Sequence, residues 1–75
     1  MNNIKEAARL LLHLLESERL NSDAVERLEI VDNELLINYT AEAGLPEKME
    51  LQEYEGQSHI FETKKYDVPV YVTLV

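Results

Sequence analysis

The spacing of apolar residues changes once along this chain, and that change does most to limit how the chain can fold. From Ile4 to Leu15 apolar residues recur at helical spacing, which is typical of a helix with one apolar face. After Asp23 they alternate with polar residues, which is typical of strands. The sequence therefore predicts an α+β fold, with one N-terminal amphipathic helix packed on an antiparallel sheet of four or five strands in a meander of hairpins.

The N-terminal helix is predicted over about residues 3–18. Asn3 followed by Glu6 is a capping pair, because each side chain can reach a free backbone N–H of the first turn. Beyond Ser17 the pattern fails, since Glu18 would enter the apolar face. At about 100° per residue the apolar side chains fall within an arc of about 200°; they are Ile4, Ala7, Ala8, Leu10, Leu11, Leu12, Leu14 and Leu15.

Strands are predicted at residues 26–31, 35–40, 49–54, 57–63 and 68–75. The first two form a hairpin, because Asp32-Asn33 tolerates the positive φ of a two-residue turn. A slip of one residue would move every apolar side chain to the wrong face. The alternative for residues 23–28 is a short helix. The expected register places Ile30 opposite Leu35, Leu28 opposite Ile37 and Glu26 opposite Tyr39.

Two predicted turns disagree about which residue of the fourth strand faces the core. A tight turn at Glu55-Gly56 sets Leu51 opposite Ile60, and His59 opposite Gln52. A four-residue loop at 64–67 instead sets Phe61 opposite Val70, on the inner face. Either a bulge intervenes or both faces of the sheet are apolar. Met49 and Leu51 are expected to face inward, as are Val68, Val70, Val72 and Leu74, with Pro69 at an edge or before regular pairing begins.

One helix covers one face of such a sheet, so the second face needs a partner if it is apolar. We expect that outer face to carry Leu36, Tyr54, Tyr71 and Val75, with one of Ile60 or Phe61. Exposed apolar faces are normally buried by association. A chain of 75 residues without cysteine also has a core worth only about 3–5 kcal/mol. The sequence therefore predicts a homodimer through this face.

The charge of the chain is strongly negative, with a net value of −8. Direct nucleic-acid binding is not expected, because it requires a basic footprint. Residues 16–62 hold thirteen acids and three bases, so the acids concentrate in the middle of the chain. We expect them to bind a basic protein, although such charge also serves solubility alone. The predicted partner-binding residues are Glu26, Glu29, Asp32, Glu34, Glu47, Glu50, Glu53 and Glu55.

The residues that usually carry chemistry are sparse. There is no cysteine, and His13 and His59 fall in different elements without metal-ligand spacing, so no metal or cofactor site is predicted. His13 is expected on the exposed side of the helix. No serine lies in a nucleophile elbow, and two glycines cannot build a phosphate-binding loop. We predict no catalytic residues and no enzymatic activity.

These observations predict a single domain over residues 1–75 that acts by binding in the cytoplasm. The expected function is that of an acidic protein–protein interaction module, such as an inhibitor or a phage or mobile-element accessory protein, with a basic partner. One alternative is a homo-oligomeric structural subunit. Another is a small ligand-binding or catalytic domain with its site at a dimer interface. No membrane association is expected, since no apolar run approaches the ~18 residues that a span requires.

Overall fold

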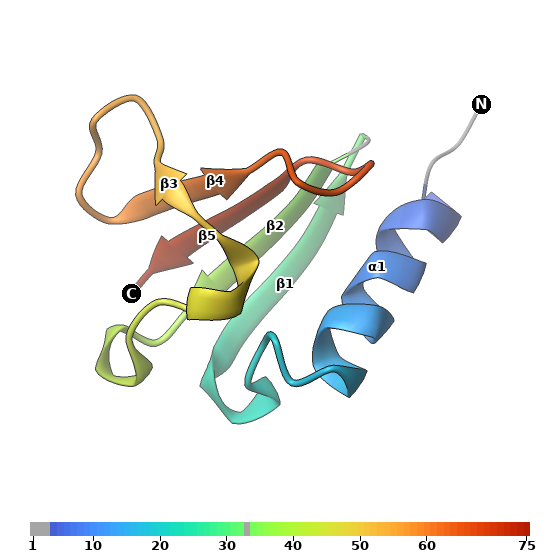
Figure 1. Cartoon of the computed structure of the whole chain (residues 1–75), viewed down its shortest axis with the longest axis horizontal. Helices are drawn as coiled ribbons and strands as arrows, with labels where there is room; N and C mark the ends of the chain where they lie inside the picture. Colours follow the sequence, from blue (N-terminus) through green and yellow to red (C-terminus); the bar gives the residue numbers. More distant parts are fainter. Residues whose placement is uncertain (1–3, 33) are drawn as a thin grey trace.

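The computed structural model describes residues 4–32 and 34–75, which form one α-helix and a five-stranded sheet (Figure 1). The α+β class with an N-terminal helix is therefore confirmed. The strand order is β1-β2-β5-β4-β3, and neighbouring strands are antiparallel except for β2 and β5. The bounds are α1 Ile4–Glu16, β1 Val25–Val31, β2 Glu34–Tyr39, β3 Gln52–Glu53, β4 Ile60–Thr63 and β5 Val70–Leu74.

Helix α1 packs on the sheet through a narrower face than the sequence predicted. Ala7 and Leu14 are fully buried, whereas Ala8 is exposed and Leu12 is 56 % exposed. The helix ends at Glu16, and Glu18 adopts a positive φ of 59°. This turn of the chain allows Leu20 to enter the core. The predicted capping residue Asn3 lies outside the described residues.

The first hairpin has the predicted register over most of its length. Ile30 faces Leu35 and Leu28 faces Ile37, as expected. Near its start β1 contains a bulge between Val25 and Arg27, so Tyr39 faces Val25 and the prediction of Glu26 there is wrong. A 3₁₀ turn at Ser22–Ala24 precedes the strand, and residues 25–31 are extended rather than helical. Asn33, the second residue of the predicted turn, is outside the described part.

The meander order is wrong, because β5 and not the next strand of the chain pairs with β2. Residues 40–51 pass through 3₁₀ turns at Ala41–Ala43 and Glu47–Met49, and Glu50 is left-handed with a φ of 54°. The predicted strand at 49–54 is therefore reduced to β3 at the far edge, although Met49 is buried as expected. The central position of the apolar strand β5 leaves its inward residues Val70 and Val72 fully buried.

The loop between β3 and β4 is wider than predicted. A tight turn does form at Glu55-Gly56, where both residues have positive φ and Gln57 N–H donates to the Tyr54 carbonyl at 2.9 Å. The loop then continues through His59, so Glu53 faces Phe61 and the expected pairing of Leu51 with Ile60 is wrong. Gln52 faces Glu62 for the same reason, and His59 is exposed in the loop.

The loop before β5 is also longer than the four predicted residues, because Thr63 pairs with Val70. Phe61 consequently faces Val72 instead of Val70, but it stays on the inner face. The two longer loops remove the disagreement between the predicted turns: Phe61 faces the core and Ile60 faces outward. Pro69 precedes the first residue of β5, which confirms that it lies before regular pairing.

The core lies between the inner face of the sheet and a layer made by α1 and the irregular segments. The sheet contributes Leu35, Ile37 and Tyr39 from β2, the strand next to the central strand β5. The opposing layer contributes Ala7, Leu14, Leu20, Met49 and Val68. The Tyr39 hydroxyl accepts a hydrogen bond from Asn21 N–H at 3.1 Å, which satisfies its polar end. Within the described residues, no helix has the length and apolar character to cross a bilayer.

Candidate interaction surface

The face of the sheet opposite the core, which we call the open face, is built from rows of side chains that cross all five strands. Because alternate residues of a strand share a face, the strand pairing identifies these rows. The first row crosses the centre of the sheet and runs Glu29, Leu36, Tyr71, Glu62, Gln52. The second row lies beside it and runs Arg27, Asn38, Thr73, Ile60, Tyr54. Glu34 precedes Leu36 on the same face.

The middle of the open face is apolar and aromatic. Leu36, Ile60, Tyr54 and Tyr71 are each only partly buried. The rings of Tyr54 and Tyr71 meet edge to face, with centroids 5.4 Å apart and planes at 87°. This geometry is favourable for two aromatic rings and holds both in place. The open face therefore presents a fixed aromatic pair beside two aliphatic side chains.

Carboxylates border this apolar centre. Burial raises the pKa of the Tyr71 hydroxyl above its usual value, and the negative charges of Glu34 and Glu62 raise it further, with a smaller contribution from Tyr54. Both glutamates are therefore close enough to Tyr71 to act on its charge. Glu29 stands beside Leu36 in the same row. Against these three acids, Arg27 is the one base in the two rows.

The structure brings together most of the residues predicted for self-association. Leu36, Tyr54 and Tyr71 lie on the open face, and Tyr71 is next to each of the other two. Val75 is 58 % exposed and lies directly after β5, where its N–H donates to the Tyr39 carbonyl at 2.9 Å. It therefore lies at the rim of the open face rather than at its centre.

The predicted acidic residues do not form one surface. Glu29 and Glu34 belong to the open face, and Glu26 and Asp32 lie along β1 and its turn. The other four lie on or near β3, at the opposite edge of the sheet: Glu47, Glu50, Glu53 and Glu55. Sequence reasoning missed Glu62. The two predicted turns disagreed on whether Ile60 or Phe61 faces the core, so the face of the sheet that carries Glu62 could not be assigned.

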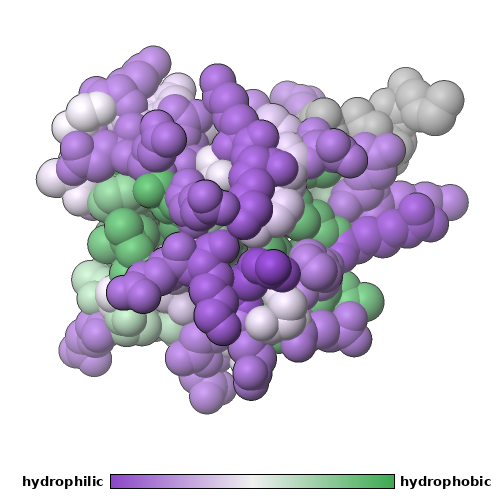
Figure 2. All heavy atoms as spheres, in the orientation of Figure 1, coloured by the Kyte–Doolittle hydropathy of each residue, from purple (hydrophilic) through white to green (hydrophobic). Residues whose placement is uncertain are grey.

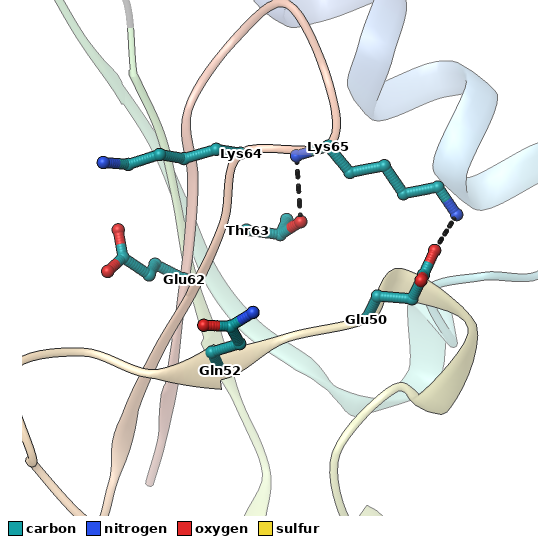
Figure 3. Close-up of a pocket in the computed structure, with 6 residues that line it drawn as sticks. All are labelled: Glu50, Gln52, Glu62, Thr63, Lys64 and Lys65. Atoms are coloured by element: carbon teal, nitrogen blue, oxygen red, sulfur yellow. Dashed lines mark hydrogen bonds and ion pairs between the residues drawn. The ribbon is translucent and has the colours of Figure 1, made fainter.

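A cavity of about 400 Å³ opens where β3 and β4 separate (Figure 3). Its charged residues are Glu50, Glu62, Lys64 and Lys65, whose charges cancel. Lys65 forms an ion pair with Glu50, and the hydrogen bond and charge of this ammonium hold the pKa of Glu50 below its usual value. Both side chains are well exposed, so water screens the pair. Gln52 and Glu62 also belong to the first row of the open face, so the cavity lies at the margin of that face.

A second hollow, of about 510 Å³, lies between α1 and the segment 65–68. Glu6, Arg9 and Leu10 line it from the helix, and Tyr66 and Val68 are among the residues facing them. It holds neither of the histidines. Its acidic and basic side chains are again mixed, so it has no charge preference that would select a ligand.

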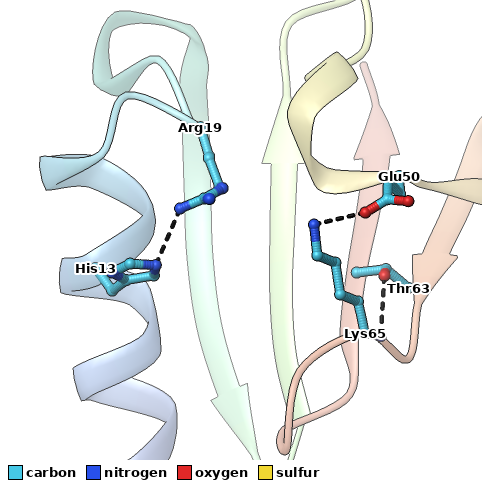
Figure 4. Close-up of polar contacts among 5 residues, drawn as sticks. All are labelled: His13, Arg19, Glu50, Thr63 and Lys65. Carbon is cyan, nitrogen blue, oxygen red and sulfur yellow. Dashed lines mark hydrogen bonds and ion pairs between the residues drawn. The ribbon is translucent and has the colours of Figure 1, made fainter.

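The histidines lie in different elements, and neither belongs to the two rows of the open face. His13 is exposed on α1, as expected, and its Nε2 lies 3.0 Å from Arg19 Nη1 (Figure 4). Since a guanidinium only donates, the imidazole nitrogen accepts in this contact. His59 lies in the loop before β4, where its carbonyl accepts from Leu74 N–H at 2.8 Å. Across residues 4–32 and 34–75, no group of three or more metal-ligating side chains is close enough to hold an ion.

Comparison of the chain with protein-family models, with curated proteins and with solved structures finds no match.

Proposed function

We propose that this chain is a protein–protein interaction module whose open face binds a basic partner. The observation that carries the proposal is the combination, on one face, of an apolar aromatic centre with carboxylates at its border. Apolar contact supplies affinity when it is removed from water, and the acids select for complementary charge. The proposed action is binding alone, as an inhibitor or accessory protein acting in the cytoplasm.

The charge of the open face favours a basic partner over a second copy of the chain. Two copies stacked through this face would bring Glu29, Glu34 and Glu62 of each into one interface. Like charges placed together in an interface cost free energy. Within the rows described above, Arg27 offsets one of these three carboxylates in each copy. The self-association that the sequence suggested for this face is therefore the less favourable occupant.

The chemistry of the face describes the partner more closely. Tyr71 and Tyr54 present aromatic rings, which attract a guanidinium or an ammonium above their faces. Glu62 and Glu34 lie near Tyr71 and can pair with the same cation. Leu36 and Ile60 lie beside them and require an apolar side chain. We infer that the partner surface carries arginine or lysine next to an aliphatic residue.

A peptide titration tests this proposal. The probe is a synthetic peptide of alternating arginine and leucine, and the control peptide alternates glutamate and leucine. Backbone amide shifts measured by NMR are expected to change in β2, β4 and β5 with the basic peptide and not with the acidic one. Raising the salt from about 50 to about 500 mM should weaken the binding, because the charges are exposed.

Two matched variants locate the site. Glu62→Gln removes a carboxylate from the open face, whereas Glu47→Gln removes one from the opposite edge region. Both change the net charge equally, so a difference between them is not a general charge effect. Binding that weakens more in Glu62→Gln supports the proposal. Equal weakening, or shifts spread over all exposed acids, would show that the open face is not the binding site.

A further inference from the structure

Strand β1 forms one edge of the sheet, and some of its backbone N–H and carbonyl groups point away from β2. On β2, Leu35 N–H donates to Pro69 and the Tyr39 carbonyl accepts from Val75, so these residues turn their backbone groups toward β5. The alternate residues Leu36 and Asn38 therefore direct their backbone N–H and carbonyl groups toward β1. There Leu36 pairs with Glu29, and Asn38 pairs with Arg27. Leu28 lies between these two partners, so its N–H and carbonyl point away from β2.

The side chains along this edge are also open. Most of β1 is exposed, and Leu28 and Val31 are each 39 % exposed. On α1, Leu10 lies to one side of the buried residue Leu14 and meets the segment before β5. By helical geometry Leu12 lies about 160° around the helix from Leu14, so its exposed side chain points away from the buried face. In the view of Figure 2, hydrophobic atoms remain visible between the hydrophilic side chains.

We propose that a second copy of this chain pairs with β1, by antiparallel addition of its own β1 about a two-fold axis at Leu28. The two five-stranded sheets then join into one continuous sheet. Leu28 of one copy faces Leu28 of the other, and each N–H donates to the opposite carbonyl. The exposed Leu28 side chains come together on the inner side.

The charges of β1 select this register among the neighbouring ones. With the axis at Leu28, Arg27 of each copy faces Glu29 of the other, which gives two opposite-charge pairs on the outer side. Moving the axis to Arg27 would place arginine against arginine. Moving it to Glu29 would place glutamate against glutamate. Only the register centred on Leu28 is therefore self-complementary within this short stretch.

The bulge near the start of β1 limits how far the pairing extends. Charged residues and bulges at sheet edges commonly prevent strand addition. Here the bulge falls between Val25 and Arg27, so the stretch from Arg27 to Glu29 remains regular. The charges within that stretch are complementary rather than alike. The edge is thus suited to its own copy and poorly suited to strands that carry a different charge pattern.

This pairing is separate from the partner proposed for the open face. Strand addition at β1 uses the edge of the sheet and leaves Leu36 and Tyr71 accessible. It places the open faces of the two copies side by side on one surface. A Leu36→Lys variant, which places a positive charge in the apolar centre of the open face, is therefore expected to lose the basic peptide and to keep the dimer, so that the two proposals fail independently.

Charge reversal tests the dimer. Sedimentation or light scattering over a concentration series should show a monomer–dimer equilibrium. Arg27→Glu and Glu29→Arg should each weaken it about ten-fold or more, because both opposite-charge pairs become repulsive. The double variant Arg27→Glu with Glu29→Arg should restore it. Lys48→Glu is the control, because it reverses an exposed charge in the 3₁₀ turn at Glu47–Met49.

A proline variant tests the backbone pairing. Leu28→Pro removes an N–H that points out of the sheet, so the monomer should fold, as circular dichroism will report, while the dimer is lost. If that variant does not fold, the charge series decides. A chain that stays monomeric up to about 1 mM would overturn the proposal. So would a dimer that the single charge reversals leave unchanged, or one that the double swap does not restore.

Discussion

The two faces of the sheet share their strands but differ in what covers them. On β2, Leu35 and Ile37 point inward and are almost fully buried, whereas Leu36 between them points outward and is only partly buried. On β5 the same contrast holds between Val72 and Tyr71. A single residue step therefore separates a side chain that holds the fold together from one that is available for binding. Stability and recognition are assigned to opposite faces of the same strands.

The largest expected effect contrasts neighbouring residues of β2. Ile37→Ala should lower the free energy of unfolding by about 2–5 kcal/mol, because it leaves a cavity in the core. Leu36→Ala should cost about 1 kcal/mol or less, since its side chain is already partly in water. Chemical denaturation of both variants measures the difference. Equal losses would mean that the open face contributes to the core as much as the inner face does.

The aromatic pair gives a smaller effect and tests whether the open face has its own structure. Tyr54→Ala and Tyr71→Ala in a double-mutant cycle should show a coupling of about 0.5–1.5 kcal/mol, which is typical of edge-to-face rings. The measurement is again the free energy of unfolding, with Tyr66→Ala combined with Tyr54→Ala as the uncoupled control. Additive losses would indicate that the two rings do not interact.

The free energy of unfolding should depend on pH through the ionisation of Tyr71, whose pKa is raised in part by nearby glutamates. Its pKa is raised in the folded state, by burial first and by Glu34 and Glu62 next, so the folded protein keeps its proton at a pH where the unfolded chain loses it. Stability should therefore be complete below about pH 10 and fall as pH rises through the raised pKa. Tyr71→Phe should remove this part of the slope. Ultraviolet titration of the phenol should show a lower pKa in Glu62→Gln.

The smallest effect is expected away from both faces, at the exposed pair of Glu50 and Lys65. Lys65→Met removes the hydrogen bond and the charge that lower the pKa of Glu50, so this pKa should return to its usual value. Carboxyl NMR titration measures it. Whatever stability the pair supplies is present above the ordinary carboxyl pKa and is lost as pH falls through the lowered one. A Lys64→Met variant is the matched control and should leave Glu50 unchanged.

Local patterns predicted the elements well because neighbouring residues decide them. The alternation around Leu35 and Ile37 identified the first hairpin and its register, and the failure of the helical pattern at Glu18 located the end of α1. The assignment of Leu36, Tyr54 and Tyr71 to one face depended on the same alternation. These features require no knowledge of distant contacts.

Strand order could not be predicted in the same way, because it depends on contacts between distant residues. Nothing local indicates that Val70 lies beside Leu35. The positive φ of Glu50 shortened the third strand, and the extra residues Gln57 to His59 changed the register of the next pair. Glutamate carries no local sign of a left-handed conformation, which glycine would have given. The predicted partner-binding acids lie apart because of this strand order, which places β1 and β3 at opposite edges of the sheet.

The position of β5 has a consequence for how the molecule is made. Its residues are synthesised after all the other strands, yet they occupy the middle of the sheet, between β2 and β4. Until Val70 to Leu74 arrive, the first hairpin and the β3–β4 pair share no strand–strand contact and each exposes half of a core. The two pairs can therefore become one sheet only when β5 inserts between them.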